Sequence, residues 1–125
     1  MHLREDNLNR TSIERSESNK EYIFKVILIG DGAVGKTSLI RRYMEGKFKA
    51  DYLTTIGSQV YTKRLVGKSE TKITLAVWDI SGQPAFASVR AEYYKGAKAI
   101  LLVYDLTRPI TFHHLDGWIN ETKRY

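Results

Sequence analysis

The sequence contains no cysteine, only two prolines and no long apolar run. Without cysteine the chain can form no disulfide bond, thiolate metal site or cysteine nucleophile, and it offers no cysteine for lipid attachment. No stretch approaches the roughly 18 consecutive apolar residues of a membrane-spanning helix. The first 20 residues are polar and charged, so they also lack the apolar core of a signal peptide. These absences favour a soluble, cytoplasmic protein with no membrane anchor of its own on this chain.

Positive charge is in mild excess. The chain has 20 Lys and Arg residues against 14 Asp and Glu residues, which gives a net charge of +6. The basic residues are scattered and are not interleaved with aromatic side chains, as they would be on a base-stacking surface. We therefore expect no nucleic-acid partner. A mildly positive domain also suits a small polyanionic ligand.

Two regions differ in composition. Residues 1–20 combine many charges with few aliphatic side chains, so they bury too little surface to fold and are expected to form a flexible polar extension. Residues 21–125 carry the apolar segments and are long enough to form one domain with a moderate core.

Apolar segments between turns predict four strands. They span residues 22–29, 59–65, 72–80 and 99–106. Of the three expected helices, the first follows the glycine-rich turn and stops at Gly46, and the second lies within residues 81–97. The third is expected to start with Thr107 as N-cap and Pro109 in its first turn. The expected apolar faces are Leu39, Ile40, Tyr43 and Met44 on the first helix, and Phe112, Leu115, Trp118 and Ile119 on the third.

This order of elements predicts an α/β fold. Strands that alternate with helices form a mainly parallel sheet with helices on both faces, and the turn at residues 66–71 adds one antiparallel hairpin. The strand at residues 72–80 is almost continuously apolar, so we expect it at the centre of the sheet. The strand at residues 22–29 is expected to be buried, with Lys25 as its only polar residue.

The segment GDGAVGKT, at residues 30–37, matches the phosphate-loop pattern G-x-x-x-x-G-K-[ST]. Its glycines allow successive backbone N–H groups to point at phosphate oxygens, and the helix that follows adds its positive N-terminal end. Lys36 can reach the β- and γ-phosphates, and the Thr37 hydroxyl can bind Mg²⁺. A glycine-rich turn with an exposed lysine is the simpler alternative. The strand before the pattern and the amphipathic helix after it favour the phosphate loop.

A second group of polar residues follows the strand at residues 72–80, in the segment VWDISGQ. Adjacent parallel strands end at the same edge of a sheet, so Asp79 is expected beside the phosphate loop, where it could hold Mg²⁺ through water. Gly82 offers a backbone N–H to a γ-phosphate. Gln83 suits the orientation of an attacking water, because its amide both donates and accepts. Taken alone, Asp79 is typical of a turn cap and Gln83 of a surface amide; their spacing and the phosphate loop together favour the catalytic interpretation.

The chain resembles a small GTPase of the Ras superfamily, and its pattern is most similar to the Rab branch. The similar stretches are GDGAVGKTSL, GKFKADYLTTIGSQV, VWDISGQ and LLVYDLTRPITFHHLDGWI, which cover most of residues 22–125. The resemblance implies the three-layer fold of the P-loop NTPases, incomplete at its C-terminal side, with residues 21–125 as the N-terminal two-thirds of a GTPase domain. It also implies a molecular switch that binds GTP and GDP with Mg²⁺, hydrolyses GTP, and presents its switch regions to protein effectors and regulators.

The resemblance assigns roles to individual residues. Thr55 would bind Mg²⁺ and sense the γ-phosphate, Phe48 would pack on the edge of the guanine ring, and Tyr52 would close over the phosphates. Gly32 stands where a side chain typically impairs hydrolysis. The implied nucleotide contacts are Gly30, Asp31, Gly32, Ala33, Val34, Gly35, Lys36, Thr37, Ser38, Phe48, Tyr52, Thr55 and Gly82. The implied metal ligands are Thr37, Thr55 and Asp79, and the implied catalytic residues are Gln83, Lys36 and Gly82.

The second switch departs from the family pattern. Ile80 and Ser81 replace the usual Thr and Ala, and Pro84 replaces the usual Glu. A proline biases the residue before it toward an extended backbone, so we expect Gln83 to be extended and intrinsic hydrolysis to be slow. Trp78 resembles an aromatic residue that couples the switches to partners, and packing in the core is the alternative.

The family's base-recognition motif, Asn-Lys-x-Asp, does not occur in these 125 residues. A preference for guanine over adenine therefore follows from the resemblance alone. The strand at residues 99–106 is expected to leave an exposed apolar edge, which is an aggregation hazard. Two other functions stay open. One is a non-catalytic interaction module or GTPase fragment with weak or no nucleotide binding. The other is a fragment of a P-loop ATPase or kinase, against which Thr55-Ile56-Gly57 and the D-x-x-G-Q run argue.

Overall fold

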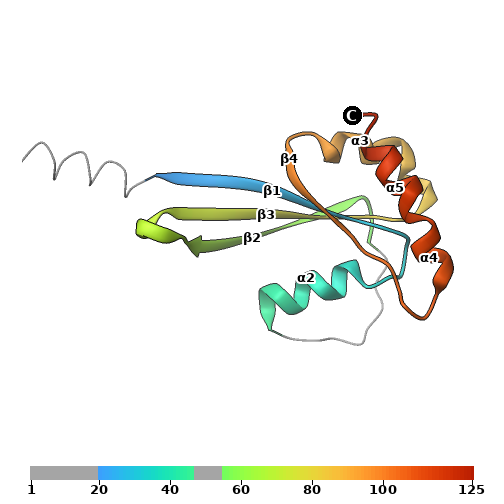
Figure 1. Cartoon of the computed structure of the whole chain (residues 1–125), viewed down its shortest axis with the longest axis horizontal. Helices are drawn as coiled ribbons and strands as arrows, with labels where there is room; N and C mark the ends of the chain where they lie inside the picture. The colour runs from blue at the N-terminus through green and yellow to red at the C-terminus, as the bar shows by residue number, and fades with distance from the viewer. Residues whose placement is uncertain (1–19, 47–54) are drawn as a thin grey trace, which may run out of the picture.

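The computed structural model describes residues 20–46 and 55–125. These residues form one sheet of four strands with helices on both of its faces (Figure 1). The strands are β1 (Glu21–Ile29), β2 (Ser58–Val66), β3 (Lys72–Ile80) and β4 (Ala97–Leu102). The helices are α2 (Lys36–Glu45), α3 (Ala87–Tyr94), α4 (Pro109–His113) and α5 (Leu115–Thr122), with the 3₁₀ helices η1 (Lys68–Glu70) and η2 (Pro84–Phe86).

The sheet has the strand order β2-β3-β1-β4. β1 is parallel to both β3 and β4, and β2 is antiparallel to β3. β3 therefore has a neighbour on each side, as its apolar sequence predicts. The α/β fold with one antiparallel hairpin is confirmed. Because β1 and β3 are parallel neighbours, with Leu28 opposite Asp79, the loops that follow these two strands leave the sheet at the same edge.

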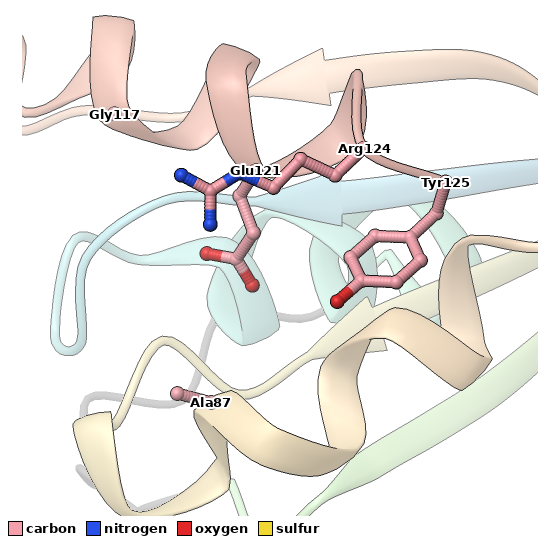
Figure 2. A pocket seen from close by; sticks show the side chains of 5 residues that line it. All are labelled: Ala87, Gly117, Glu121, Arg124 and Tyr125. Atoms are coloured by element: carbon pink, nitrogen blue, oxygen red, sulfur yellow. The ribbon is translucent and has the colours of Figure 1, made fainter.

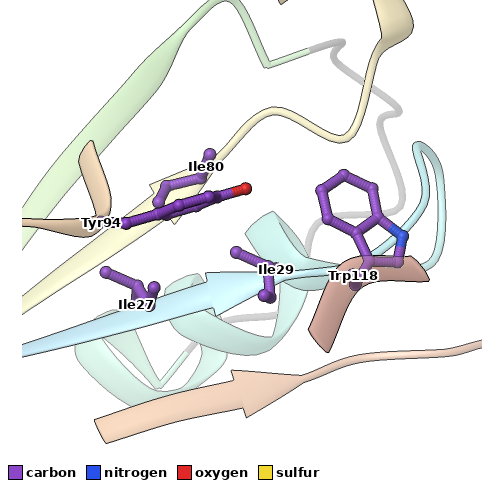
Figure 3. Packing of buried hydrophobic residues seen from close by; sticks show 5 residues of the cluster. All are labelled: Ile27, Ile29, Ile80, Tyr94 and Trp118. Carbon is purple, nitrogen blue, oxygen red and sulfur yellow. The ribbon is translucent and has the colours of Figure 1, made fainter. Parts of the chain in front are cut away.

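Side chains that alternate along β1 and β3 form two cores, one on each face of the sheet. The cluster under α3 and α5 consists of Ile27, Ile29, Ile80, Tyr94 and Trp118 (Figure 3). The cluster under α2 consists of Leu28, Ile40 and Val77. Burying an aliphatic or aromatic side chain of this size stabilises the fold by about 1.5–3 kcal/mol. Both cores lie toward the carboxyl ends of β1 and β3, so they stabilise the edge at which the loops begin.

The opposite half of β1 is exposed. Figure 1 shows β1, β2 and β3 extending beyond the helices. Ile23 is 75% exposed and its neighbours Tyr22 and Phe24 are also exposed, whereas residues 27–29 are buried. The prediction of a buried strand is therefore wrong for the first half of β1. An apolar composition predicts a strand but does not indicate how far the covering helices reach.

Helix α2 ends as predicted but presents a narrower apolar face. Gly46 adopts a left-handed backbone with φ 66°, and its N–H donates to the carbonyl of Arg42, which closes the helix. Ile40 is buried and Met44 packs beside it. Leu39 and Tyr43 are 57% and 48% exposed, so their assignment to the buried face is wrong. They lie one residue back from Ile40 and Met44, which turns them about 100° around the helix.

Strand β4 is displaced toward the N-terminus relative to the predicted range of 99–106. It spans Ala97–Leu102, and its last contact with β1 runs from the N–H of Val103 to the carbonyl of Ile29 (2.9 Å). β1 is the only described strand beside it and ends at Ile29, so the chain leaves the sheet there. Ile100 and Leu101 are 44% and 52% exposed, which confirms the exposed apolar edge.

The last predicted helix is divided into α4 and α5 at His114, whose ψ of −11° departs from the regular helical value. Thr107 is not the N-cap. Its N–H and hydroxyl both donate to Oδ1 of Asp105 (2.9 and 2.7 Å), and Arg108 precedes α4 instead. This turn competes with capping because a short acidic side chain binds the backbone two residues ahead. Pro109 does occupy the first turn, as predicted.

The apolar face predicted for this segment is also only partly correct. Trp118 is buried, but Phe112 is 54% exposed and packs edge-on against Tyr104. Leu115 and Ile119 are half-buried. Among residues 20–46 and 55–125, no helix has both the length and the apolar character that crossing a membrane requires.

Candidate functional site

The phosphate-loop segment lies where its sequence predicts. Residues 30–35 connect the end of β1 to the start of α2, and Lys36, Thr37 and Ser38 form the first turn of that helix. Within the described part of the chain, no side chain caps the N-terminus of α2. The first N–H groups of the helix therefore remain available for an anion, and the helix dipole favours negative charge there.

Lys36 is folded against the loop that precedes it. Its ammonium group donates to the carbonyls of Gly30 (2.8 Å) and Asp31 (2.7 Å), and the residue is only 6% exposed. An ammonium group has three protons, so one remains for a phosphate oxygen. Burial lowers the pKa of Lys36 to about 8, and the nearby carboxylates of Asp79 and Asp31 oppose that shift. The two carbonyl contacts fix the charge at the mouth of the loop.

Three oxygen-bearing side chains meet beside Lys36. The hydroxyls of Thr37 and Thr55 lie 2.7 Å apart, and Thr37 also donates to Oδ2 of Asp79. Asp79 is fully buried, and its Oδ1 has no hydrogen-bond partner among the described residues. Burial raises the pKa of Asp79, whereas the Thr37 hydrogen bond and the Lys36 charge lower it. An unpartnered buried carboxylate oxygen beside two hydroxyls is an all-oxygen donor set, which fits a hard cation such as Mg²⁺.

The loop after β3 lies directly on the phosphate loop. A Cβ placed on Gly82 would lie 2.2 Å from the carbonyl oxygen of Gly30 and 2.6 Å from the backbone N of Gly32, so only glycine fits there. A Cβ on Gly32 would lie 2.9 Å from Nε2 of Gln83. The Gln83 amide therefore rests against Gly32, where a side chain would displace it. This contact gives a physical reason for the glycine at position 32.

Gln83 has the extended backbone that Pro84 predicts, with φ −66° and ψ 134°, and Pro84 opens η2. The substituted pair before it also has a structural role. Ile80 is part of the core, and the buried Ser81 accepts a hydrogen bond from the N–H of Gln83 (3.2 Å) and donates its own N–H to the carbonyl of Gly57 (2.8 Å). Ser81 thus connects the segment after Thr55 to the loop that carries Gln83.

Sequence reasoning missed several residues that hold the phosphate loop in place. Oδ1 of Asp31 accepts a hydrogen bond from Nε1 of Trp118 (2.8 Å), and Oδ2 lies 2.6 Å from Nδ1 of His114. Arg108 donates to the carbonyl of Gly32 (3.2 Å). Burial raises the pKa of Asp31, but the hydrogen bonds from Trp118 and His114 outweigh it and lower the pKa overall. His114 and Trp118 are four residues apart, a helical spacing that could have indicated two donors on one face.

Two predicted site residues, Phe48 and Tyr52, lie outside the described residues. Trp78 is half-buried beside the core, with the ammonium group of Lys25 lying 4.0 Å from its ring centroid and the ring of Tyr93 nearby. The described residues contain no group of three His, Cys, Asp or Glu side chains that could hold a metal ion. A cation at this site would therefore depend on hydroxyl groups together with Asp79.

Comparison with known proteins supports one family. The family model described as "Ras family" matches residues 25–125. Ras-related protein RABA1b from Arabidopsis thaliana is 40% identical over 112 residues, which are 89% of this chain and 51% of the relative. Ras-related protein RABA4d from the same organism is 42% identical over 103 residues (82% of this chain, 46% of the relative). Ras-related protein Rab-7b from Paramecium octaurelia is 39% identical over 104 residues (83% and 50%).

The chain spans about half the length of these curated relatives. The match nevertheless covers the phosphate loop, the strand and loop that carry Asp79 and Gln83, and the C-terminal helices of the described structure. The sheet order, the phosphate loop and the family match agree: this chain belongs to the Ras family and is Rab-like.

Proposed function

We propose that this chain carries the phosphate- and metal-binding half of a guanine-nucleotide-dependent molecular switch that hydrolyses GTP to GDP with Mg²⁺. The observation that carries the proposal is the junction of three segments at one edge of the sheet. Lys36 is held against the phosphate loop, and Thr37, Thr55 and Asp79 place their oxygens beside it. A glycine-rich turn without this function would not require a buried, partly unpartnered carboxylate.

Different residues of the site would serve different parts of phosphoryl transfer. The N–H groups of residues 30–38 and the ammonium group of Lys36 would bind and orient the phosphates. Thr37, Thr55 and Asp79 would hold Mg²⁺, directly or through water, and the bound cation would offset negative charge on the phosphates. The Gln83 amide would orient the attacking water, and the Gly82 N–H would donate to the γ-phosphate. Phe48 and Tyr52 would contact the guanine ring and the phosphates, as the resemblance implies.

Two loops would report the nucleotide state. Thr55 already contacts Thr37, and Gly82 lies against the phosphate loop. A bound γ-phosphate would add further contacts to both segments, so its loss on hydrolysis would loosen them. While the γ-phosphate is bound, the surface formed by the two ordered loops would bind protein effectors and regulators. Because Gln83 is extended before Pro84, we expect slow intrinsic hydrolysis that depends on a partner for full rate.

Calorimetric titration of the full 125-residue chain with GDP, GTP and ATP, each with Mg²⁺ and with EDTA, tests the proposal. We expect GDP and GTP to bind more tightly with Mg²⁺ than with EDTA, and weaker binding of ATP would support the guanine preference that the resemblance implies. Thr37→Val removes one metal ligand and should abolish the Mg²⁺ effect. The matched control is Thr62→Val, which removes an exposed hydroxyl from β2 and should titrate like the unchanged chain.

Three outcomes contradict the proposal. If no nucleotide binds, the alternative holds instead: a non-catalytic interaction module or a GTPase fragment without nucleotide binding. Equal affinity for ATP and GTP would indicate a general phosphate loop without guanine preference. If Thr37→Val and Thr62→Val behave alike, the oxygen cluster does not hold the metal.

A further inference from the structure

Arg90 is a buried cation to which the proposed mechanism gives no role. It lies on α3, is 6% exposed, and donates from its guanidinium group to three acceptors. Two are the carboxylate oxygens of Glu121 on α5, reached by Nε (2.9 Å) and Nη2 (3.2 Å) in a bidentate pair. The third is the backbone carbonyl of Gln83, which Nη1 reaches at 2.9 Å. One planar group therefore joins α5 to the loop that carries the water-orienting amide.

Glu121 also accepts a hydrogen bond from a second residue of α3. The hydroxyl of Tyr94 donates to Oε1 of Glu121 (2.9 Å), so this carboxylate accepts three hydrogen bonds from α3. Burial raises the pKa of Glu121, but Arg90 and Tyr94 together outweigh it and lower the pKa overall. For Arg90, burial lowers the pKa of the guanidinium group and the Glu121 contacts raise it above its usual value. Both groups stay charged, and the pair resists separation because loss of Glu121 would leave the Arg90 charge buried without a carboxylate partner.

The same guanidinium group is also connected to the phosphate loop through Trp118. Its central carbon lies 4.5 Å from the ring centroid of Trp118, in a cation–π contact. Trp118 in turn donates from Nε1 to Asp31 of the phosphate loop (2.8 Å). An unbroken series of contacts thus runs from Gln83 through Arg90 and Trp118 to Asp31. It joins the two loops that must both be in place around a γ-phosphate.

We propose that Arg90, held by Glu121, is a positioning residue that fixes the backbone of Gln83 and, through Trp118, couples the loop after β3 to the phosphate loop. Arg90 acts through other residues and touches no reacting atom. The inference rests on the proposed GTPase function for its catalytic consequence. The coupling between the loops is a property of the chain itself and can be measured without nucleotide.

The Arg90–Glu121 ion pair is accessible to solvent on its Glu121 side. A pocket of about 290 Å³ lies between α3 and α5 and is lined by Ala87, Gly117, Glu121, Arg124 and Tyr125 (Figure 2). Figure 2 shows the Glu121 carboxylate extending from α5 toward α3, with Arg124 and Tyr125 beside it. Gly117 presents no side chain here, and a Cβ built on it would meet no atom within 4 Å. Water can therefore reach Glu121 while Arg90 stays buried, so Glu121 is the solvent-accessible partner of the ion pair.

Amide hydrogen exchange of the nucleotide-free chain tests the coupling. Arg90→Lys keeps the charge but cannot contact Glu121 and Gln83 with one planar fork. Loss of a charge-assisted hydrogen bond should raise exchange at residues 81–86 by about tenfold, with a smaller rise at residues 30–35. The matched control is Lys95→Gln, which removes a cation from the exposed ion pair with Glu92 next to the same helix and should change neither segment.

The variant Trp118→Phe tests the contact with Asp31 separately from the contact between Arg90 and Gln83. It keeps a smaller aromatic ring beside Arg90 and removes the N–H that reaches Asp31, so we expect faster exchange at residues 30–35 and a smaller change at residues 81–86. Unchanged exchange at residues 81–86 in Arg90→Lys overturns the proposal. A uniform rise that includes β1 and β3 also overturns it, because that result indicates general destabilisation.

Single-turnover hydrolysis then measures the catalytic consequence. In Arg90→Lys we expect the rate at saturating GTP to fall by about tenfold, while the affinity for GDP, which lacks the γ-phosphate, stays within about twofold. An unchanged rate overturns the positioning role. If the unaltered chain binds no nucleotide, the proposed function fails, but the exchange experiment still decides whether Arg90 couples the two loops.

Discussion

Ala33 has a left-handed backbone, with φ 60°, in the middle of the phosphate loop. The conformation brings a Cβ close to the following carbonyl and costs roughly 1–2 kcal/mol for a residue other than glycine. Ala33 is exposed, so its methyl group gains little from packing. The loop therefore stores strain at one of the proposed nucleotide contacts, a common property of functional sites.

Ala33→Gly should relieve this strain. Glycine adopts the left-handed region without penalty but costs about 0.4–1 kcal/mol more to order from the unfolded chain. We expect a net increase of about 0.5–1 kcal/mol in the free energy of unfolding, measured by urea denaturation followed by tryptophan fluorescence. Ala87→Gly, at the start of α3 with φ −56°, is the control and should lower stability. Equal destabilisation by both substitutions would show that the backbone of Ala33 is not strained.

Residue-scale chemistry was predicted more completely from the sequence than the contacts that support it. Lys36, Thr37 and Asp79 meet as expected because a phosphate loop and two parallel strands bring them to one edge. Arg90 and Glu121 were missed because they are 31 residues apart on different helices, and no local pattern marks either. A pairing of this kind depends on how α3 and α5 pack, which the periodicity of one helix does not determine.

At the scale of elements, α5 contains a glycine that its geometry does not need. Gly117 lies in the interior of the helix, and a Cβ there would meet no atom within 4 Å. Gly46 likewise has open space around it. Its φ of 66°, however, is a left-handed conformation that ends α2 and favours glycine. The two positions have the same free space and opposite backbone demands.

Gly117→Ala should therefore stabilise the chain by about 1 kcal/mol, through the higher helix propensity of alanine. Gly46→Ala should destabilise it by a comparable amount, since alanine must adopt the left-handed conformation. Thermal unfolding followed by circular dichroism measures both changes, as a rise of several degrees in Tm for the first variant and a fall for the second. A fall in Tm for Gly117→Ala would contradict the open space that the structure assigns to this position.

The errors in assigning buried faces share one physical cause. Period-2 and helical patterns identified the four strands and the helices. They also assigned Leu39, Tyr43 and the first half of β1 to the interior, whereas all of these are exposed in the structure. Apolar periodicity indicates which side chains share a face; the area that the neighbouring element covers is decided by tertiary packing. The N-cap was misassigned for a different, local reason, because the Asp105 carboxylate accepts hydrogen bonds from the Thr107 N–H and hydroxyl in a turn.

At the scale of the whole molecule, the described sheet ends at β4, whose outer edge is unpaired and carries exposed apolar side chains. β4 pairs with β1 alone among the described strands, and Ile100 and Leu101 on it are 44% and 52% exposed. An unpaired strand edge with apolar side chains on both faces is a template for pairing with another chain. In the segment that follows the strand, Leu106 and Phe112 are 84% and 54% exposed, so further apolar side chains are accessible there.

Leu101→Lys should reduce association of the 125-residue chain through this edge. A lysine on an edge strand adds a charge that a paired neighbour would have to bury, so concentration-dependent light scattering should fall. Leu39→Lys is the matched control: Leu39 is similarly exposed, at 57%, but lies on α2 and offers no free strand edge. If both substitutions lower scattering equally, exposed apolar area drives association. If only Leu101→Lys does so, association proceeds by strand pairing along β4, because the two variants remove similar apolar area and add the same charge.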